Sequence, residues 1–151
     1  MEQKFIENGY TLVDFEDKSD VYVINTCTVT NMSDKKSRQV IRRVKQINPE
    51  AILVVTGCYA QVAKDKLKNI SDIDIVIGNN EKNSILEIVE NSIKEKVTDV
   101  MNQKEFIDFG ATTYTEKTRA VIKVQDGCDR FCSYCIIPYA RGRVRSRTIE
   151  S

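Results

Sequence analysis

Short apolar runs alternate with helical patterns along the first two thirds of the chain, and this alternation most constrains its fold. Three runs are largely apolar and are typical of strands: residues 21–26, 51–56 and 73–77. Helical patterns surround them at residues 1–8, 34–48, 61–69 and 81–96. Strands that are apolar on both faces need cover on both sides. The alternation therefore predicts an α/β fold, an open parallel sheet with helices on both faces.

The pattern changes after residue 97. Residues 98–117 are polar with scattered aromatics, and a further apolar run at 120–125 resembles a strand. We therefore expect one domain at 1–97, a linker at 98–117 and the start of a second domain at 118–151. In a barrel of repeating strand and helix, the chemistry lies where such strands end.

Three closely spaced cysteines follow that last strand. Cys128, Cys132 and Cys135 form Cys-x-x-x-Cys-x-x-Cys. A [4Fe-4S] cluster with three protein ligands keeps one iron open to a small molecule, so the spacing favours a catalytic cluster. Zinc is the alternative, but it needs a fourth ligand, and a chain without histidine would have to supply a distant cysteine or a carboxylate. Unligated thiols are the third interpretation.

The remaining two cysteines follow the first two strands. Cys27 comes directly after residues 21–26, and Cys58 comes shortly after residues 51–56. Since the carboxyl ends of parallel strands share one edge of a sheet, we expect these thiols near each other, where they would suit a second metal site. The alternative is that each is a small buried apolar side chain.

The cysteine triplet, with Tyr134 directly before its last member, resembles the radical S-adenosylmethionine signature. The resemblance implies that the open iron binds S-adenosyl-L-methionine and that Tyr134 lies against its adenine. An electron from the cluster would then release a 5′-deoxyadenosyl radical. An electron donor such as flavodoxin or ferredoxin is implied as well.

Three motifs in order resemble the methylthiotransferases: residues 24–30, residues 56–61, and the triplet continued through 136–142. Residues 21–31, 36–39 and 41–43 resemble the branch that methylthiolates carbon 2 of N6-threonylcarbamoyladenosine beside the tRNA anticodon. Sister branches modify isopentenyladenosine in tRNA or an aspartate of a ribosomal protein. The family implies a methylthiotransferase N-terminal domain followed by a radical S-adenosylmethionine β/α barrel, two [4Fe-4S] clusters, and the tRNA anticodon stem-loop as partner.

This chain departs from the family pattern at both ends. The family has a third auxiliary-cluster cysteine after a first strand, whereas Met1 lies in the helix that should follow that strand. The auxiliary cluster on Cys27 and Cys58 is thus expected to lack one ligand. The chain stops at Ser151 with only the first strand and cluster loop of the barrel. We expect residues 118–151 to pack poorly and the truncated chain to be inactive alone.

Positively charged residues are clustered in two segments of this sequence. The net charge is only +1, but residues 34–48 hold six cations and one acid. After the triplet, Arg141, Arg143, Arg145 and Arg147 alternate, which in an extended backbone would form one strip suited to phosphates. The plainer interpretation is a solvated charged surface. A noncatalytic cysteine–metal module that binds RNA through these arginines remains the alternative function.

Other sequence features concern location and chemistry. Five cysteines, an odd number, and no signal peptide predict a reducing cytoplasm, and apolar runs of strand length predict no membrane association. Without histidine there is no Ser–His or Cys–His dyad, so hydrolytic chemistry has few candidate groups.

Overall fold

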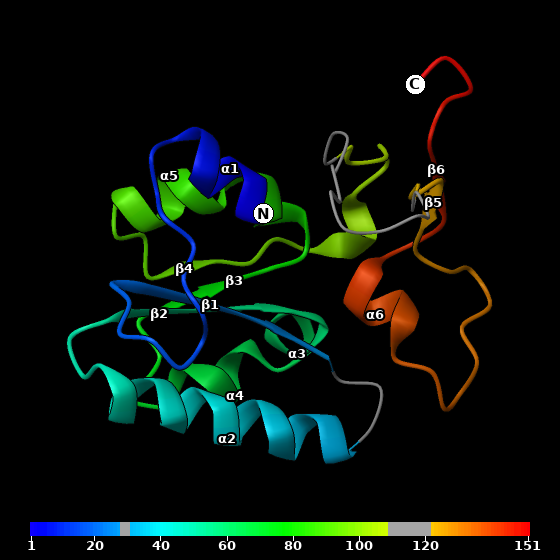
Figure 1. The fold of residues 1–151 in the computed structure, drawn as a ribbon. Coiled ribbons are helices and arrows are strands. Elements are labelled where there is room, and N and C mark those ends of the chain that lie inside the picture. Colours follow the sequence, from blue (N-terminus) through cyan, green and yellow to red (C-terminus); the bar gives the residue numbers. More distant parts are fainter. Residues whose placement is uncertain (28–30, 109–121) are drawn as a thin grey trace. The chain divides into compact units, whose positions relative to one another are not determined.

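The structure, a computed structural model, describes residues 1–27, 31–108 and 122–151. In the helix that begins at residue 31, it describes side chains from residue 36 onward. The chain divides into two compact units, Met1–Thr98 and Asp99–Ser151 (Figure 1).

A four-stranded parallel sheet forms the centre of the first unit. Its strands follow chain order across the sheet: β1 (Val21–Thr26), β2 (Ile52–Gly57), β3 (Ile75–Ile77) and β4 (Glu95–Lys96). The register between β1 and β2 starts with Val21 opposite Ile52 and ends with Thr26 opposite Gly57. The two strands therefore end level with each other.

Helices cover both faces of this sheet (Figure 1). One face carries α2 (Asn31–Ile47), α3 (Cys58–Val62) and α4 (Lys64–Lys68). The other face carries α1 (Glu2–Glu7) and α5 (Ile85–Glu90), the latter preceded by the 3₁₀ helix η1 (Asn80–Ser84). The predicted α/β fold, a parallel sheet with helices on both faces, is confirmed.

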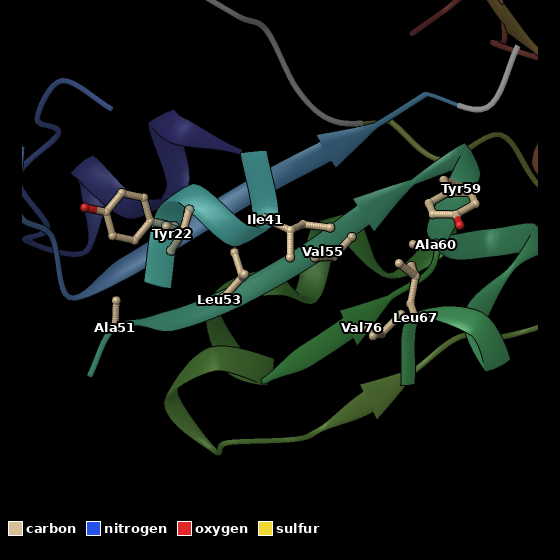
Figure 2. Packing of buried hydrophobic residues seen from close by; sticks show 10 residues of the cluster. Tyr22, Ile41, Ala51, Leu53, Val55, Tyr59, Ala60, Leu67 and Val76 are labelled. Carbon is tan, nitrogen blue, oxygen red and sulfur yellow. The ribbon is translucent and has the colours of Figure 1, made fainter. Parts of the chain in front are cut away.

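Each strand sends alternate side chains into one of two cores. Leu53 and Val55 of β2 pack with Ile41 of α2 and Leu67 of α4, and none of these four is accessible to solvent (Figure 2). Alternation of side chains across a strand sends the residues between them to the other face. This is why β1, β2 and β3 are largely apolar on both faces.

The second core lies against α1 and α5. Val54 and Ile77 meet Ile85 and Ile88 of α5 there, and Phe5 of α1 completes the contact. The helix α1 thus belongs to the fold through a single buried ring, because Phe5 is its one buried residue.

Two expected helices differ from the structure. The helix expected at 61–69 begins earlier, at Cys58, and is interrupted at Ala63, whose ψ of 31° leaves the helical region. The helix expected at 81–96 ends at Glu90, because Ser92 takes a positive φ of 51° that turns the chain. Residues 95–96 instead form β4 and extend the sheet.

The second unit has little regular structure. It contains η2 (Val100–Asn102), β5 (Gln125–Asp126), α6 (Ile137–Arg141) and β6 (Arg145–Ser146), and β5 pairs antiparallel with β6. Of the strand expected at 120–125, residues 122–124 are described without strand structure and 120–121 lie outside the described residues. Residues 109–117 of the expected linker also lie outside them.

Packing in the second unit is sparse. Ile122, Val124 and Ile149 are mostly exposed, whereas Val100 and Ala140 are buried. No barrel is present among the described residues. Within the same residues, no helix has the length and apolar character needed to cross a membrane.

Candidate metal centres

Three cysteines of the second unit share one loop. Cys128, Cys132 and Cys135 all lie between β5 and α6, in a segment with neither helix nor strand, and all three are half-buried. The Cys135 N–H donates to the Cys132 carbonyl at 2.9 Å, which closes a turn between the last two cysteines. Phe131, directly before Cys132, has a positive φ of 47°. The loop backbone therefore bends sharply between the first and last thiols.

The base of this loop is closed by backbone contacts. The Cys128 N–H donates to the Gly142 carbonyl at 3.1 Å. Gly127 has a φ of 79°, and a side chain there would collide with the Arg143 carbonyl. Glycine is required at this position because it alone accepts that dihedral and that approach of another backbone.

Asp126 directly precedes the loop, and its carboxylate interacts with positively charged side chains. Its carboxylate accepts from Lys123 Nζ at 2.6 Å and from the Gly127 N–H at 3.0 Å, and Arg141 lies 3.9 Å away. Burial raises the pKa of this carboxyl, but the Lys123 hydrogen bond and charge, the Gly127 N–H and the Arg141 charge together hold the pKa below its ordinary value. The carboxylate is therefore charged at neutral pH.

The two cysteines of the first unit follow neighbouring strand ends. Cys27 comes directly after β1, and Cys58 is the first residue of α3, directly after β2. Cys27 is exposed and Cys58 is buried. Asn79, which follows β3, places its side-chain nitrogen 4.0 Å from the Cys58 sulfur. The topology thus brings both thiols to the carboxyl edge of the sheet, as the sequence predicts, with unequal access to solvent.

The donor chemistry of the triplet fits an iron–sulfur cluster, because cysteine thiolates are the standard ligands of such clusters and one short loop carries three of them. The side chains are not arranged around a common position. Within the described part of the chain, no three cysteine, aspartate or glutamate side chains form a group that could hold a metal ion. The ligand roles of Cys128, Cys132, Cys135, Cys27 and Cys58 stay predictions.

Tyr134 stands next to the last cysteine of the triplet. Its side chain is 90% exposed, so the ring is open to a ligand on this loop. Contact between this ring and the adenine of S-adenosyl-L-methionine stays a prediction.

The four alternating arginines do not form one extended strip. Arg141 ends α6, and only Arg145 lies in a strand. Arg145 is also 6% exposed, which removes it from the surface. The expected strip was wrong in geometry because the helix α6 and the turn at Gly142 interrupt the extended backbone that it needs. Contact of these arginines with RNA stays a prediction.

Nearby acids pair with these arginines. Arg143 lies 3.9 Å from Asp129, and Arg147 lies 2.7 Å from Asp108. Sequence analysis missed this role of the acids. A signal was available, since Asp126 and Asp129 stand close to Cys128 on either side.

The helix α2 presents cations on its outer face. Arg38, Arg42 and Arg43 are exposed, whereas Lys45 is half-buried and donates to Asp74 at 2.8 Å and to the Ala51 carbonyl at 2.7 Å. Lys45 therefore stabilises the fold. Lys36, Arg38 and Arg42 are exposed to an anionic partner, whereas Arg43 is paired with Glu16.

In a comparison with known proteins, residues 1–78 match a family described as "Uncharacterized protein family UPF0004". The "Threonylcarbamoyladenosine tRNA methylthiotransferase MtaB" of Aquifex aeolicus is 46% identical over 99% of this chain and 38% of its own length. The protein of the same description from Bacillus subtilis is 45% identical over 98% of this chain and 34% of its own length.

A relative named for a different substrate also matches. The "Ribosomal protein uS12 methylthiotransferase RimO" of Desulfitobacterium hafniense is 35% identical over 94% of this chain and 34% of its own length. The chain thus spans between 34 and 38% of the length of these three curated relatives.

Proposed function

The chain belongs to the family UPF0004, and on that basis we propose that it is a methylthiotransferase, or part of one, that modifies N6-threonylcarbamoyladenosine in tRNA at carbon 2. The observation that carries this proposal is the 46% identity to a threonylcarbamoyladenosine tRNA methylthiotransferase along 99% of this chain. That span includes both units and all five cysteines. The named activity is that of relatives of which this chain spans 34–38% of the length.

The cysteine loop has the central role in this proposal. Cys128, Cys132 and Cys135 would hold a [4Fe-4S] cluster, and S-adenosyl-L-methionine bound there would supply the radical that removes a hydrogen from the substrate. Gly127 and the Cys128–Gly142 hydrogen bond fix where the loop begins. Tyr134, at 90% exposure, would lie against the adenine of the cosubstrate.

The first unit has an auxiliary role. Cys27 and Cys58 would bind a second [4Fe-4S] cluster at the carboxyl edge of the sheet. Two thiols are fewer than such a cluster uses, so we expect this second cluster to be labile when only these two ligands hold it.

The proposed partner is the anticodon stem-loop of tRNA, and the proposed electron donor is a flavodoxin or ferredoxin. The exposed arginines Arg38 and Arg42 of α2 support the first of these, because exposed guanidinium groups suit phosphate contacts. Arg143 of the second unit, whose side chain is 60% exposed, supports it as well. A cytoplasmic location belongs to the same proposal, since tRNA is modified there and free thiols persist in a reducing compartment.

A second candidate substrate is a ribosomal protein. The identity of 35% to a uS12 methylthiotransferase over 94% of this chain favours it. In both cases the chemistry at the cysteine loop is the same, and the substrate alone differs.

Anaerobic loading of the chain with iron and sulfide tests the proposal. We expect the wild-type chain and the variant Cys58→Ser to hold about four irons on the triplet, with the absorbance of an iron–sulfur cluster. The variant Cys132→Ser should lose that iron. A chain that retains only zinc, or a Cys132→Ser variant that binds iron like the wild type, would contradict the proposed cluster.

A further inference from the structure

Arg145 is a charged side chain enclosed by the second unit. Its side chain is 4% exposed, and its Nη2 donates to the Arg141 carbonyl at 2.6 Å. Its Nη2 also lies 3.7 Å from a carboxylate oxygen of Asp126. Its Nε and Nη1 have no hydrogen-bond partner among the described residues. Burial of a guanidinium is costly unless it is paired, so this position calls for a reason other than contact with solvent or RNA.

Its two contacts bracket the base of the cysteine loop. Asp126 precedes Gly127 and Cys128, and in the β5–β6 pair it is the register partner of Arg145. Arg141 precedes Gly142, whose carbonyl accepts the Cys128 N–H. One side chain therefore joins the segment that enters the loop to the segment against which Cys128 is held.

The backbone segments around these contacts are closely packed. Gly142 has a φ of 79°, and a side chain there would collide with the Val100 carbonyl. Gly127, across the Cys128–Gly142 hydrogen bond, has the same φ and a similar collision with the Arg143 carbonyl. These two close backbone approaches need an element that holds them in place, and β5 and β6 have only two residues each.

We propose that Arg145 is a positioning residue of the cysteine loop, which fixes Cys128 relative to Cys132 and Cys135 by linking Asp126 to the Arg141–Gly142 turn. This inference rests on the proposed function for its purpose, namely placement of three thiols around one cluster. Its structural content, the anchoring of the loop base, does not depend on the metal. Arg145 is thereby distinguished from the exposed arginines, whose side chains reach solvent.

Amide hydrogen exchange of the metal-free chain tests the anchoring directly. In Arg145→Met, exchange at Cys128 should be about tenfold faster, because its hydrogen bond to Gly142 opens more often. Arg145→Lys should restore part of the protection through the Asp126 contact. Arg130→Met is the matched control, since Arg130 is an exposed arginine of the same loop. Unchanged exchange at Cys128 in Arg145→Met would overturn the proposal.

A second readout separates local from global effects. Exchange at residues 52–57 of β2 should remain at the wild-type level in every variant, because that strand belongs to the other unit. Loss of protection there in Arg145→Met would also overturn the proposed local role. Anaerobic iron loading should fall several-fold in Arg145→Met and stay unchanged in Arg130→Met. If the wild-type chain binds no iron, the proposed function fails, whereas the exchange result still decides the role of Arg145.

Discussion

Thr26 and Gly57 are register partners at the ends of two parallel strands, so the cysteines that follow them leave the sheet from neighbouring strand ends. Gly57 also has a φ of 99°, and a Cβ there would lie 2.7 Å from the Thr26 nitrogen and would collide with its carbonyl. The parallel pairing of β1 and β2 brings Cys27 and Cys58 to one edge. The close approach of the two backbones at this point depends on the absence of a side chain at residue 57.

The substitution Gly57→Ala should therefore lower the free energy of unfolding by about 2–4 kcal/mol, through backbone strain and the clash with Thr26. Urea denaturation measures this. Gly9→Ala is the matched control, because Gly9 has a φ of 85° but nothing within 4 Å of an added Cβ. It should cost only about 1 kcal/mol of strain. Equal losses in the two variants would show that the strand approach is not critical.

The thiols of the first unit should differ in reactivity. Cys27 is exposed and Cys58 is 6% exposed, so iodoacetamide should alkylate Cys27 at least about tenfold faster in the metal-free, folded chain. Peptide mass spectrometry follows each site separately. In urea the two rates should converge. Equal rates in the folded chain would mean that Cys58 is not enclosed by α3 and the sheet.

The edge strand β4 is tied to α4 by an ion pair with a predictable pH dependence. The Lys68 ammonium lies 2.6 Å from Glu95, and this hydrogen bond is the main cause of a raised pKa of Lys68. Burial opposes the rise, and the charges of Glu95 and Asp65 add to it. A raised folded-state pKa means that the contribution to stability is complete below the unfolded pKa of about 10.4 and is lost as pH rises through the folded value.

Lys68→Met should thus be less stable than the wild type at pH 8, and the difference should disappear as the pH rises through the raised folded-state pKa of Lys68. Urea denaturation across this pH range checks this. The control is Lys66→Met, which removes an exposed lysine of the same helix. A difference for Lys68→Met that persists at high pH would show that the alkyl chain, not the charge, accounts for it.

The core against α2 should dominate the stability of the first unit. Leu53 is inaccessible to solvent at the centre of that core, so Leu53→Ala should cost about 2–5 kcal/mol. Leu12→Ala, at a position that is 50% exposed, should change stability by no more than about 0.5 kcal/mol. Thermal or urea unfolding distinguishes them. Similar losses would contradict the assignment of the core.

Sequence patterns predicted those parts of the fold that long apolar segments specify. The strand at 21–26 agrees in both bounds, and its apolar residues 21–24 follow the polar residues 18–20. The strand β4 was missed because Glu95 and Lys96 are polar and too few for a periodicity, and their pairing with β3 comes from tertiary contacts.

The candidate site, like the fold, was predictable only in part from the sequence. The topology that places Cys27 and Cys58 at one edge follows from the parallel strands, so it was predictable. The burial of Arg145 was not, since it depends on the turn at Gly142 and on the short pairing of Asp126 with Arg145, two features without a local sequence signal. Charge spacing alone cannot distinguish an enclosed guanidinium from one that faces solvent.

The most direct measurement of the central claim is electron paramagnetic resonance of the anaerobically reconstituted and reduced chain, with and without S-adenosyl-L-methionine. A cluster held by three thiolates keeps one iron open to the cosubstrate. We therefore expect a cluster signal that changes when the cosubstrate is added and that disappears in Cys132→Ser. A signal that is the same with and without the cosubstrate, or one that persists in Cys132→Ser, would contradict the account.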